Sequence, residues 1–202
     1  LLARFHAEHP AIELRLKLGN REQLAALMEA NELDLTVMGR PPQALATRAE
    51  PFAMHPHGLI TAPEHPFAQM ESVPAAALAR EPFIVREDGS GTRAALMQYL
   101  EHHRLQPVLV MEMDSTEAIK QAVMAGLGVS LVSLHTIGLE MRHGLLAAPA
   151  VEGLPLMRRW HVVHLAAKLL SPAAEALRYF ILERGEAHLA AMFAADGARG
   201  AR

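Results

Sequence analysis

The sequence predicts an α/β protein made of two Rossmann-like subdomains, with a central cleft between them and a two-strand hinge that joins them. Short apolar runs alternate with longer stretches of helical periodicity, in one group before residue 62 and in a second group after it. Two prolines within 62–66 mark the boundary between the groups. A last strand and a long helix are expected to return to the first group. Subdomain one then covers 1–62 and 158–202, and subdomain two covers 63–157.

The composition is that of a globular protein and excludes several classes. The chain has 202 residues, of which 51% are hydrophobic, so it can bury one large core or two small ones. It has no cysteine, which excludes a disulfide framework and a thiolate metal site. Its formal net charge of −3 argues against direct binding to nucleic-acid phosphates. No apolar run approaches the roughly 20 residues that span a membrane. The start at Leu1, inside a helical pattern, leads us to expect a fragment of a longer protein.

The first subdomain is predicted to follow β-α-β order with a parallel sheet. Leu2 and Phe5 lie at helical spacing before Pro10. The apolar residues of 12–18 alternate with charged ones, which is typical of a strand with one polar face. Asn20 is suited to cap the helix that follows. The expected elements are a helix before Pro10, a strand over 12–18, a helix over 21–31, a strand over 33–38, a loop over 43–50 and a strand within 52–61.

The second subdomain repeats strands and helices in alternation, and a final strand and helix follow it. Asp114 or Ser115 is suited to cap one of the helices, which ends at Gly126. Ser171 is placed to cap the long helix that closes the chain. The other expected elements are helices over 73–80, 92–104 and 135–141, and strands over 82–86, 108–113, 129–133, 144–148 and 159–165.

The turn at Ser90-Gly91-Thr92-Arg93 is the strongest candidate for a binding site. It follows an apolar strand and begins a helix, whose first N–H groups attract a carboxylate or a phosphate. The alternative is a cap that only satisfies its own helix, and the sequence leaves both open. A helix end contributes roughly 0.3–1 kcal/mol, whereas micromolar binding needs about 8 kcal/mol, so further donors must converge. The candidates lie near other predicted strands: Asn20, Arg21, Gly39, Arg40, Gly128, Val129 and Ser130.

No motif for catalysis or metal binding is recognisable. The turn lacks the lysine of a nucleotide-hydrolase phosphate loop, and Asp88 stands where a nucleophile elbow needs glycine. Three pairs of histidines lack the spacing of a metal site, and we interpret them as surface or half-buried residues. These pairs are His55 with His57, His102 with His103, and His161 with His164. We therefore expect no catalytic residue, no metal and no cofactor.

Several stretches resemble the effector-binding domain of LysR-type transcriptional regulators, and the resemblance extends over the chain up to about Glu183. Arg86–Arg93 is similar to the REEGSGTR segment of that family, and Glu117–Val132 is similar to its AV-x-AGLGI-x-L-P region. Leu33–Val37 resembles its LDLAI strand. Three further segments are similar to the CbbR branch, which regulates Calvin-cycle and RuBisCO operons: Met38–Pro42, Val132–Ile137 and Val151–Leu156.

The resemblance implies a fold like a type II periplasmic-binding protein, with a small, phosphorylated metabolite as the effector in the cleft. Asn20, Arg40, Thr92 and Ser130 would then donate hydrogen bonds to this effector. It also implies a cytoplasmic regulator that forms a homodimer through this domain and a tetramer in the full protein. DNA would be bound only by an N-terminal winged helix-turn-helix, which is absent from this chain, and no membrane is involved.

Two alternatives stay open at the level of the sequence. One is a periplasmic solute-binding protein of the same fold, which a leader upstream of Leu1 would favour. The other is an enzyme on this fold, which would need an acid and a base that converge in the cleft. No such pair is identifiable in the sequence, so we expect a binding protein without enzymatic activity.

Overall fold

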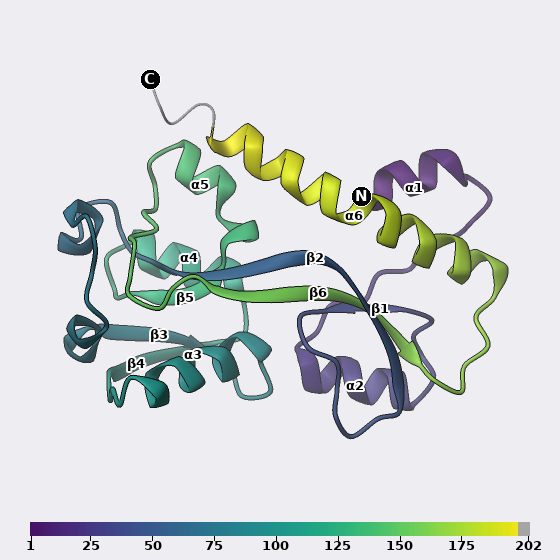
Figure 1. Cartoon of the computed structure of the whole chain (residues 1–202), viewed down its shortest axis with the longest axis horizontal. Coiled ribbons are helices and arrows are strands. Elements are labelled where there is room, and N and C mark those ends of the chain that lie inside the picture. Colours follow the sequence, from purple (N-terminus) through teal and green to yellow (C-terminus); the bar gives the residue numbers. More distant parts are fainter. Residues whose placement is uncertain (198–202) are drawn as a thin grey trace. The chain divides into compact units, whose positions relative to one another are not determined.

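The computed structural model describes residues 1–197, with side chains described for residues 1–191, and the chain folds into two compact units (Figure 1). Unit 1 contains Leu1–Met54 and Arg159–Met192, and unit 2 contains His55–Arg158. Strands β2 (Thr47–Ile60) and β6 (Leu156–Leu165) each have residues in both units, so the chain crosses between the units in each of these strands. The subdomain predicted to end at residue 202 includes 198–202, which lie outside the described residues.

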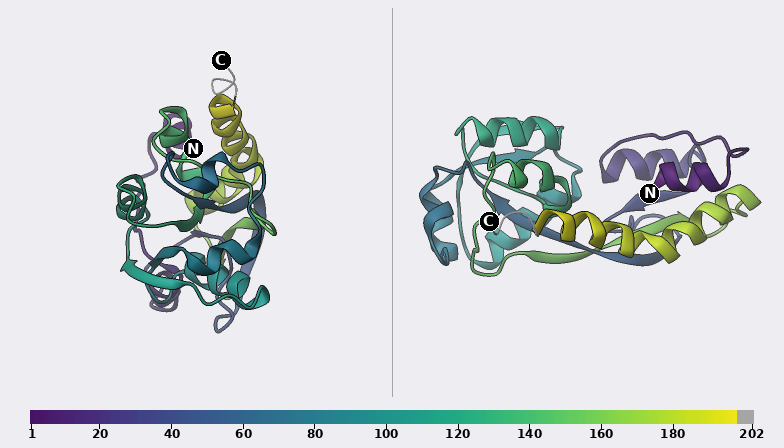
Figure 2. Two further views of the ribbon diagram at one scale, coloured as in Figure 1. Left: turned by 90° about the vertical axis from the view of Figure 1, so that its left-hand side faces the viewer. Right: turned by 90° about the horizontal axis from the view of Figure 1, so that it is seen from above.

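Unit 1 is built around the antiparallel pairing of two strands. Its complete elements are α1 (Leu2–Glu8), α2 (Arg21–Glu29) and β1 (Thr36–Met38), and most of α6 (Pro172–Gly197) belongs to it. Val37 of β1 pairs with Val162 of β6. Met28, Met38 and Val163 form the buried centre of its core. Figures 1 and 2 show α6 as one long continuous helix.

The predicted strand over 12–18 is wrong, because residues 13–20 have no regular secondary structure. The alternation of apolar and charged residues is present, but a strand also needs a neighbour that accepts and donates its backbone hydrogen bonds. None of the described strands pairs with this segment, and Leu16 and Leu18 are 70% and 88% exposed. The parallel sheet predicted for this subdomain is also wrong, since β1 pairs antiparallel with β6.

Unit 2 holds the larger number of elements. Phe83 bridges Val129 in parallel, and β3 pairs with β4 in parallel, as the alternation of strands and helices predicted. Strand β5 pairs antiparallel with the second half of β2. Its helices and strands are η1 (Pro66–Gln69), η2 (Ala75–Arg80), β3 (Pro82–Arg86), α3 (Gly91–His102), β4 (Val108–Met113), α4 (Thr116–Met124), β5 (Ser130–Ser133), η3 (Leu134–Thr136) and α5 (Gly138–Arg142), where η denotes a 3₁₀ helix.

Strand β3 separates two buried clusters in unit 2. Phe83 and Val85 point to one side and pack with residues of α3 such as Leu96. Ile84 points to the other side and packs with Ile119 of α4. Because successive residues of a strand face opposite sides, one short apolar run supplies both clusters. This packing fixes the end of β3 and, after a short turn, the first residue of α3.

Several predicted elements of unit 2 are changed in detail. The helix predicted over 73–80 is the 3₁₀ helix η2, and the helix predicted over 135–141 is divided into η3 and α5. The strand predicted over 144–148 is reduced to a bridge between Thr61 and Ala147. Ser115, rather than Asp114, caps α4 by accepting a hydrogen bond from the N–H of Ala118 at 3.3 Å.

Candidate functional site

The first turn of α3 is held by a buried serine. Ser90 is 4% exposed, and its Oγ accepts hydrogen bonds from the N–H groups of Thr92 at 3.2 Å and Arg93 at 3.4 Å. Gly89 precedes it with φ +79°, a conformation that side chains other than glycine rarely adopt. The Ser90 hydroxyl thus caps the helix, and Thr92 places a second hydroxyl next to the helix end.

The two arginines of this segment are engaged in ion pairs. Nη1 of Arg93 donates to the carbonyl of Arg86 at 2.8 Å, and the same guanidinium pairs with Asp88 at 3.1 Å and with Glu112. Arg86 donates to both carboxylate oxygens of Glu87, at 2.7 and 3.0 Å. These contacts hold the turn in place and neutralise both arginines locally, so neither supplies an uncompensated charge.

A third arginine, far away in sequence, also lies at this helix end. Nη1 of Arg158 on β6 donates to the carbonyl of Gly91 at 2.8 Å. Oγ1 of Thr92 lies 3.4 Å from Nε2 of His57 on β2. The first turn of α3 therefore meets a guanidinium and an imidazole that come from two other strands. The positive end of a helix dipole and a guanidinium act together on an anion.

Three histidine rings form a cluster beside this turn. The ring centroids of His55 and His57 are 4.2 Å apart, and the ring of His135 stacks on that of His55 at 5.8 Å. His55 and His57 are only 5% and 1% exposed, so the prediction of surface or half-buried histidines is wrong for them. The available signal was their place in an apolar run, where residues two apart share one face of a strand.

Burial and nearby positive charge keep these imidazoles neutral. Burial, with a smaller contribution from the charge of His57, lowers the pKa of His55 to about 2. Burial, followed by the charge of Arg158, lowers the pKa of His57 to about 4. Burial also lowers the pKa of His135. At neutral pH the cluster is therefore uncharged, and Arg158 is the cation that faces it.

The predicted site residues of unit 1 lie at the ends of two elements. The side chain of Asn20 caps α2, accepting from the N–H of Gln23 at 3.0 Å, and the side chain of Gln23 accepts from the N–H of Asn20 at 2.9 Å. Arg21 is the first residue of α2, and Gly39 and Arg40 form the bend after β1. The Asn20 side chain thus has a capping function within unit 1.

Gly128, Val129 and Ser130 are placed at the start of β5, beside the start of β3. The N–H of Val129 donates to the carbonyl of Pro82 at 2.9 Å, and the buried Ser130 hydroxyl donates to the carbonyl of Ile84 at 2.7 Å. A Cβ at Gly128 would lie 2.4 Å from the Pro82 oxygen, so this close approach requires glycine. Since α3 follows the opposite end of β3, these residues lie about one strand length from the Ser90 cap.

Two further properties concern the described part of the chain as a whole. Its His, Asp and Glu side chains form no group of three or more that could hold a metal ion. Its helices include none that is both long and apolar enough to cross a membrane. In the histidine cluster the rings of His55 and His135 are stacked, and those of His55 and His57 are tilted by 57°.

Residues 1–186 match the family described as the LysR substrate binding domain, and the chain belongs to this family. The HTH-type transcriptional regulator CfxR of Cupriavidus necator is 47% identical over 183 residues, which cover 91% of this chain and 58% of that protein. The RuBisCO operon transcriptional regulator of Allochromatium vinosum is 43% identical over 182 residues, covering 90% of this chain and 60% of that protein. The chain thus spans about 60% of the length of these relatives.

A solved structure shows the same fold. The regulatory domain of CcmR from Synechocystis PCC6803, in complex with 2-PG, has a TM-score of 0.87 and 36% identity, covering 90% of this chain and 88% of that chain. The predicted family, its CbbR branch and the periplasmic-binding-protein-like fold class are confirmed. The alternative of a periplasmic solute-binding protein is wrong, because the chain belongs to a family of transcriptional regulators.

Proposed function

We propose that this domain senses a small phosphorylated metabolite, and that the first turn of α3 binds the phosphate. The observation that carries this proposal is the guanidinium of Arg158 at the N-terminal end of α3, beside the hydroxyl of Thr92. A phosphate there gains from the helix dipole and from a charge-assisted hydrogen bond to the guanidinium. The 2-PG bound by the Synechocystis CcmR domain supports a ligand of this class.

The buried histidines favour binding over chemistry at this site. Their rings are neutral at pH 7 because burial lowers the pKa values of His55 and His57. Nδ1–H of His57 donates to the carbonyl of His55 at 3.2 Å, so Nε2 of the neutral ring is an acceptor that orients the Thr92 hydroxyl without a proton transfer. We therefore propose that the ligand is bound and released unchanged, and that binding shifts the populations of two conformations of the regulator.

The test is the affinity of Arg158→Gln for 2-PG and for ribulose bisphosphate, measured by calorimetry. Hydrogen bonds to charged groups contribute about 1.5–3 kcal/mol. We therefore expect the dissociation constant of Arg158→Gln to be roughly tenfold to hundredfold larger. The control is Arg159→Gln, which removes the same charge from the next, exposed residue of β6. Equal affinities of Arg158→Gln and the unchanged chain would refute the proposed site.

We further propose that the whole protein is a cytoplasmic transcription regulator that forms a homodimer through this domain. Strand β4 pairs with β3 on one side, and Val108, Leu109 and Val110 are 58%, 47% and 43% exposed. Exposed apolar residues on an edge strand are usually covered by another surface. A second copy of the chain is the occupant that agrees with the family. Tetramers and DNA binding through an N-terminal winged helix belong to the full-length protein.

A further inference from the structure

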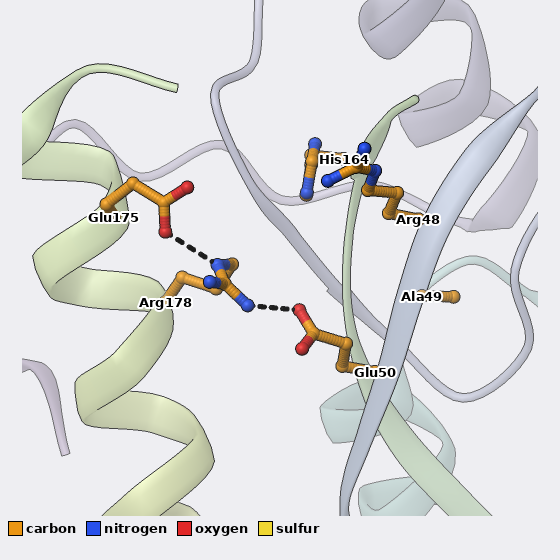
Figure 3. Close-up of a pocket in the computed structure, with 6 residues that line it drawn as sticks. All are labelled: Arg48, Ala49, Glu50, His164, Glu175 and Arg178. Atoms are coloured by element: carbon orange, nitrogen blue, oxygen red, sulfur yellow. Dashed lines mark hydrogen bonds and ion pairs between the residues drawn. The ribbon is translucent and has the colours of Figure 1, made fainter. Parts of the chain in front are cut away.

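Unit 1 contains an open, polar pocket that is separate from the α3 turn of unit 2. Its volume is about 470 Å³, within the range of roughly 300–1,000 Å³ that small-molecule sites have. Strands β2 and β6 and the first turns of α6 form its walls (Figure 3). The lining residues are Arg48, Ala49, Glu50, His164, Glu175 and Arg178.

One side of the pocket is a fixed group of two carboxylates around an arginine. Nε of Arg178 donates to Oε2 of Glu175 at 2.9 Å, and Nη1 donates to Oε2 of Glu50. Figure 3 shows Arg178 reaching from α6 to a position between the two glutamates. Burial opposes the charge of Arg178, but hydrogen bonds to Glu175 and Glu50 outweigh this effect and raise its pKa. These two ion pairs use Oε2 of each glutamate and leave Oε1 of each carboxylate available as an acceptor.

The other side of the pocket has the guanidinium of Arg48 as a donor. Arg48 forms no hydrogen bond or ion pair with any residue between Leu1 and Ala191, although it lines the pocket. His164 is 6% exposed, and its Nδ1 lies 2.9 Å from the carbonyl of Leu165. Because a carbonyl can only accept, Nδ1 carries the proton and Nε2 of the neutral ring is an acceptor. A built, buried imidazole and an uncommitted guanidinium thus share one wall.

The charges of the pocket select for a ligand of mixed charge. Two arginines and two glutamates sum to zero, so a dianion would be attracted by Arg48 and repelled by Glu50 and Glu175. A ligand with a carboxylate at one end and an ammonium at the other satisfies both walls. We propose that unit 1 carries a second small-molecule site, which binds an amino acid: its carboxylate pairs with Arg48, and its ammonium donates to the open oxygens of Glu50 and Glu175.

The experiment is a thermal-shift screen of this chain with each of the twenty proteinogenic amino acids, followed by calorimetry for those that stabilise it. We expect at least one amino acid to bind with one-to-one stoichiometry. Its N-acetyl derivative, which lacks the ammonium, and its amide, which lacks the carboxylate, should each bind at least tenfold more weakly. Stabilisation by none of the twenty, or equal binding of the amino acid and its N-acetyl derivative, would overturn the proposal.

Variants locate the site within unit 1. Arg48→Gln should weaken binding at least tenfold without a loss of folding, because Arg48 is exposed and unpaired among the described residues. Glu175→Gln tests the opposite wall and should also weaken binding, whereas Arg159→Gln is the matched control outside the pocket. An unchanged affinity in both Arg48→Gln and Glu175→Gln would overturn the assignment. The phosphate site proposed in unit 2 is measured with 2-PG, so either site can fail without the other.

Discussion

His57 is a buried, neutral imidazole whose Nε2 lies 3.4 Å from the hydroxyl of Thr92. A phosphate bound at this turn would place negative charge beside the ring and raise its pKa from about 4. Between pH 4 and the raised pKa, binding takes up a proton, so affinity falls as pH rises. The groups that face His57 are His55, His135 and Arg158, of which Arg158 is the permanent charge.

Proton uptake can be measured directly. Calorimetric titration with 2-PG at pH 6, in two buffers with different ionisation enthalpies, should show uptake that His57→Gln reduces. Because the phosphate of the ligand also titrates near pH 6, the difference between the two proteins is the informative quantity. His102→Gln, on the exposed end of α3, is the control. Equal uptake in His57→Gln and the unchanged chain would contradict a phosphate next to this ring.

The lowered pKa of His57 also makes the folded state less stable in acid. An unfolded chain binds the proton of His57 near pH 6.5, whereas the folded chain binds it only near pH 4. The unfolded state therefore holds more protons between these values, and the free energy of unfolding decreases as pH falls through this window. Bound phosphate should raise the folded-state pKa of His57. The pH window then becomes narrower, and less of the free energy of unfolding is lost.

Lys120 of α4 and Glu140 of α5 form a buried ion pair in unit 2, with Nζ 2.8 Å from Oε1. Burial opposes both charges, but hydrogen bonding raises the pKa of Lys120 and lowers that of Glu140. Lys120→Met leaves the carboxylate buried without its partner, so we expect a loss of about 3–5 kcal/mol in the free energy of unfolding at pH 7. Urea unfolding measures the loss.

The loss in Lys120→Met should shrink in acid, because protonation of Glu140 removes the unpaired charge. The matched control is Lys17→Met, which breaks an ion pair with Glu32 whose side chains are 48% and 49% exposed. That change should cost less than about 1 kcal/mol. If both variants lost the same free energy of unfolding, burial of the ion pair between Lys120 and Glu140 would not explain how much this pair stabilises the fold.

At the level of elements, β4 is the edge on which the proposed dimer depends. Val110→Lys places a charge on this edge, so we expect the variant to be more monomeric than the unchanged chain. Sedimentation equilibrium measures the shift, and circular dichroism checks that the fold is retained. Leu169→Lys is the control, since Leu169 is 96% exposed in the loop before α6. A dimer that survives Val110→Lys but not Leu169→Lys would place the interface elsewhere.

Elements with strong local signals could be predicted from the sequence. The strands β3 and β4 have the predicted bounds, and α3 begins within one residue of the prediction because Ser90 is its cap. The segment 12–18 could not be predicted, since its pattern is that of a strand and only the missing neighbour decides otherwise. Local patterns carry no information about pairing partners.

The same limit applies to the candidate site. The helix start at Ser90 and Thr92 could be predicted because a turn and a cap are local features. The grouping of His57, His135 and Arg158 around that turn depends on contacts between residues up to 67 apart in sequence, such as that between Arg158 and Gly91. The hydroxyl of Ser130 donates to the carbonyl of Ile84, a contact that no sequence pattern reveals.

At the level of the whole molecule, the two cores are drawn from different parts of the chain. All the residues of the two clusters of unit 2 belong to the continuous stretch His55–Arg158. We therefore expect a fragment of these residues, expressed alone, to unfold cooperatively on heating. Loss of near-ultraviolet circular dichroism from its one buried tyrosine, Tyr99, is the measurement. A fragment without a cooperative transition would show that unit 2 needs the remaining chain.

A matched fragment of residues 1–54 should not fold. The core of unit 1 joins Met28 and Met38 to Val163, which arrives on β6. Without β6, β1 also lacks the strand with which it exchanges backbone hydrogen bonds. A folded fragment of 1–54 would contradict this assignment of the core.

The crossings of the chain in β2 and β6 also set an order in time. On the ribosome the residues of unit 1 that appear first, Leu1–Met54, must wait for Arg159–Met192 before their core can close. Unit 2 is continuous and lies between them, so its core can close while the remainder is still being synthesised. The part of the domain that starts the chain is then the last to become native, and its core residues Met28 and Met38 need protection from aggregation for that whole interval.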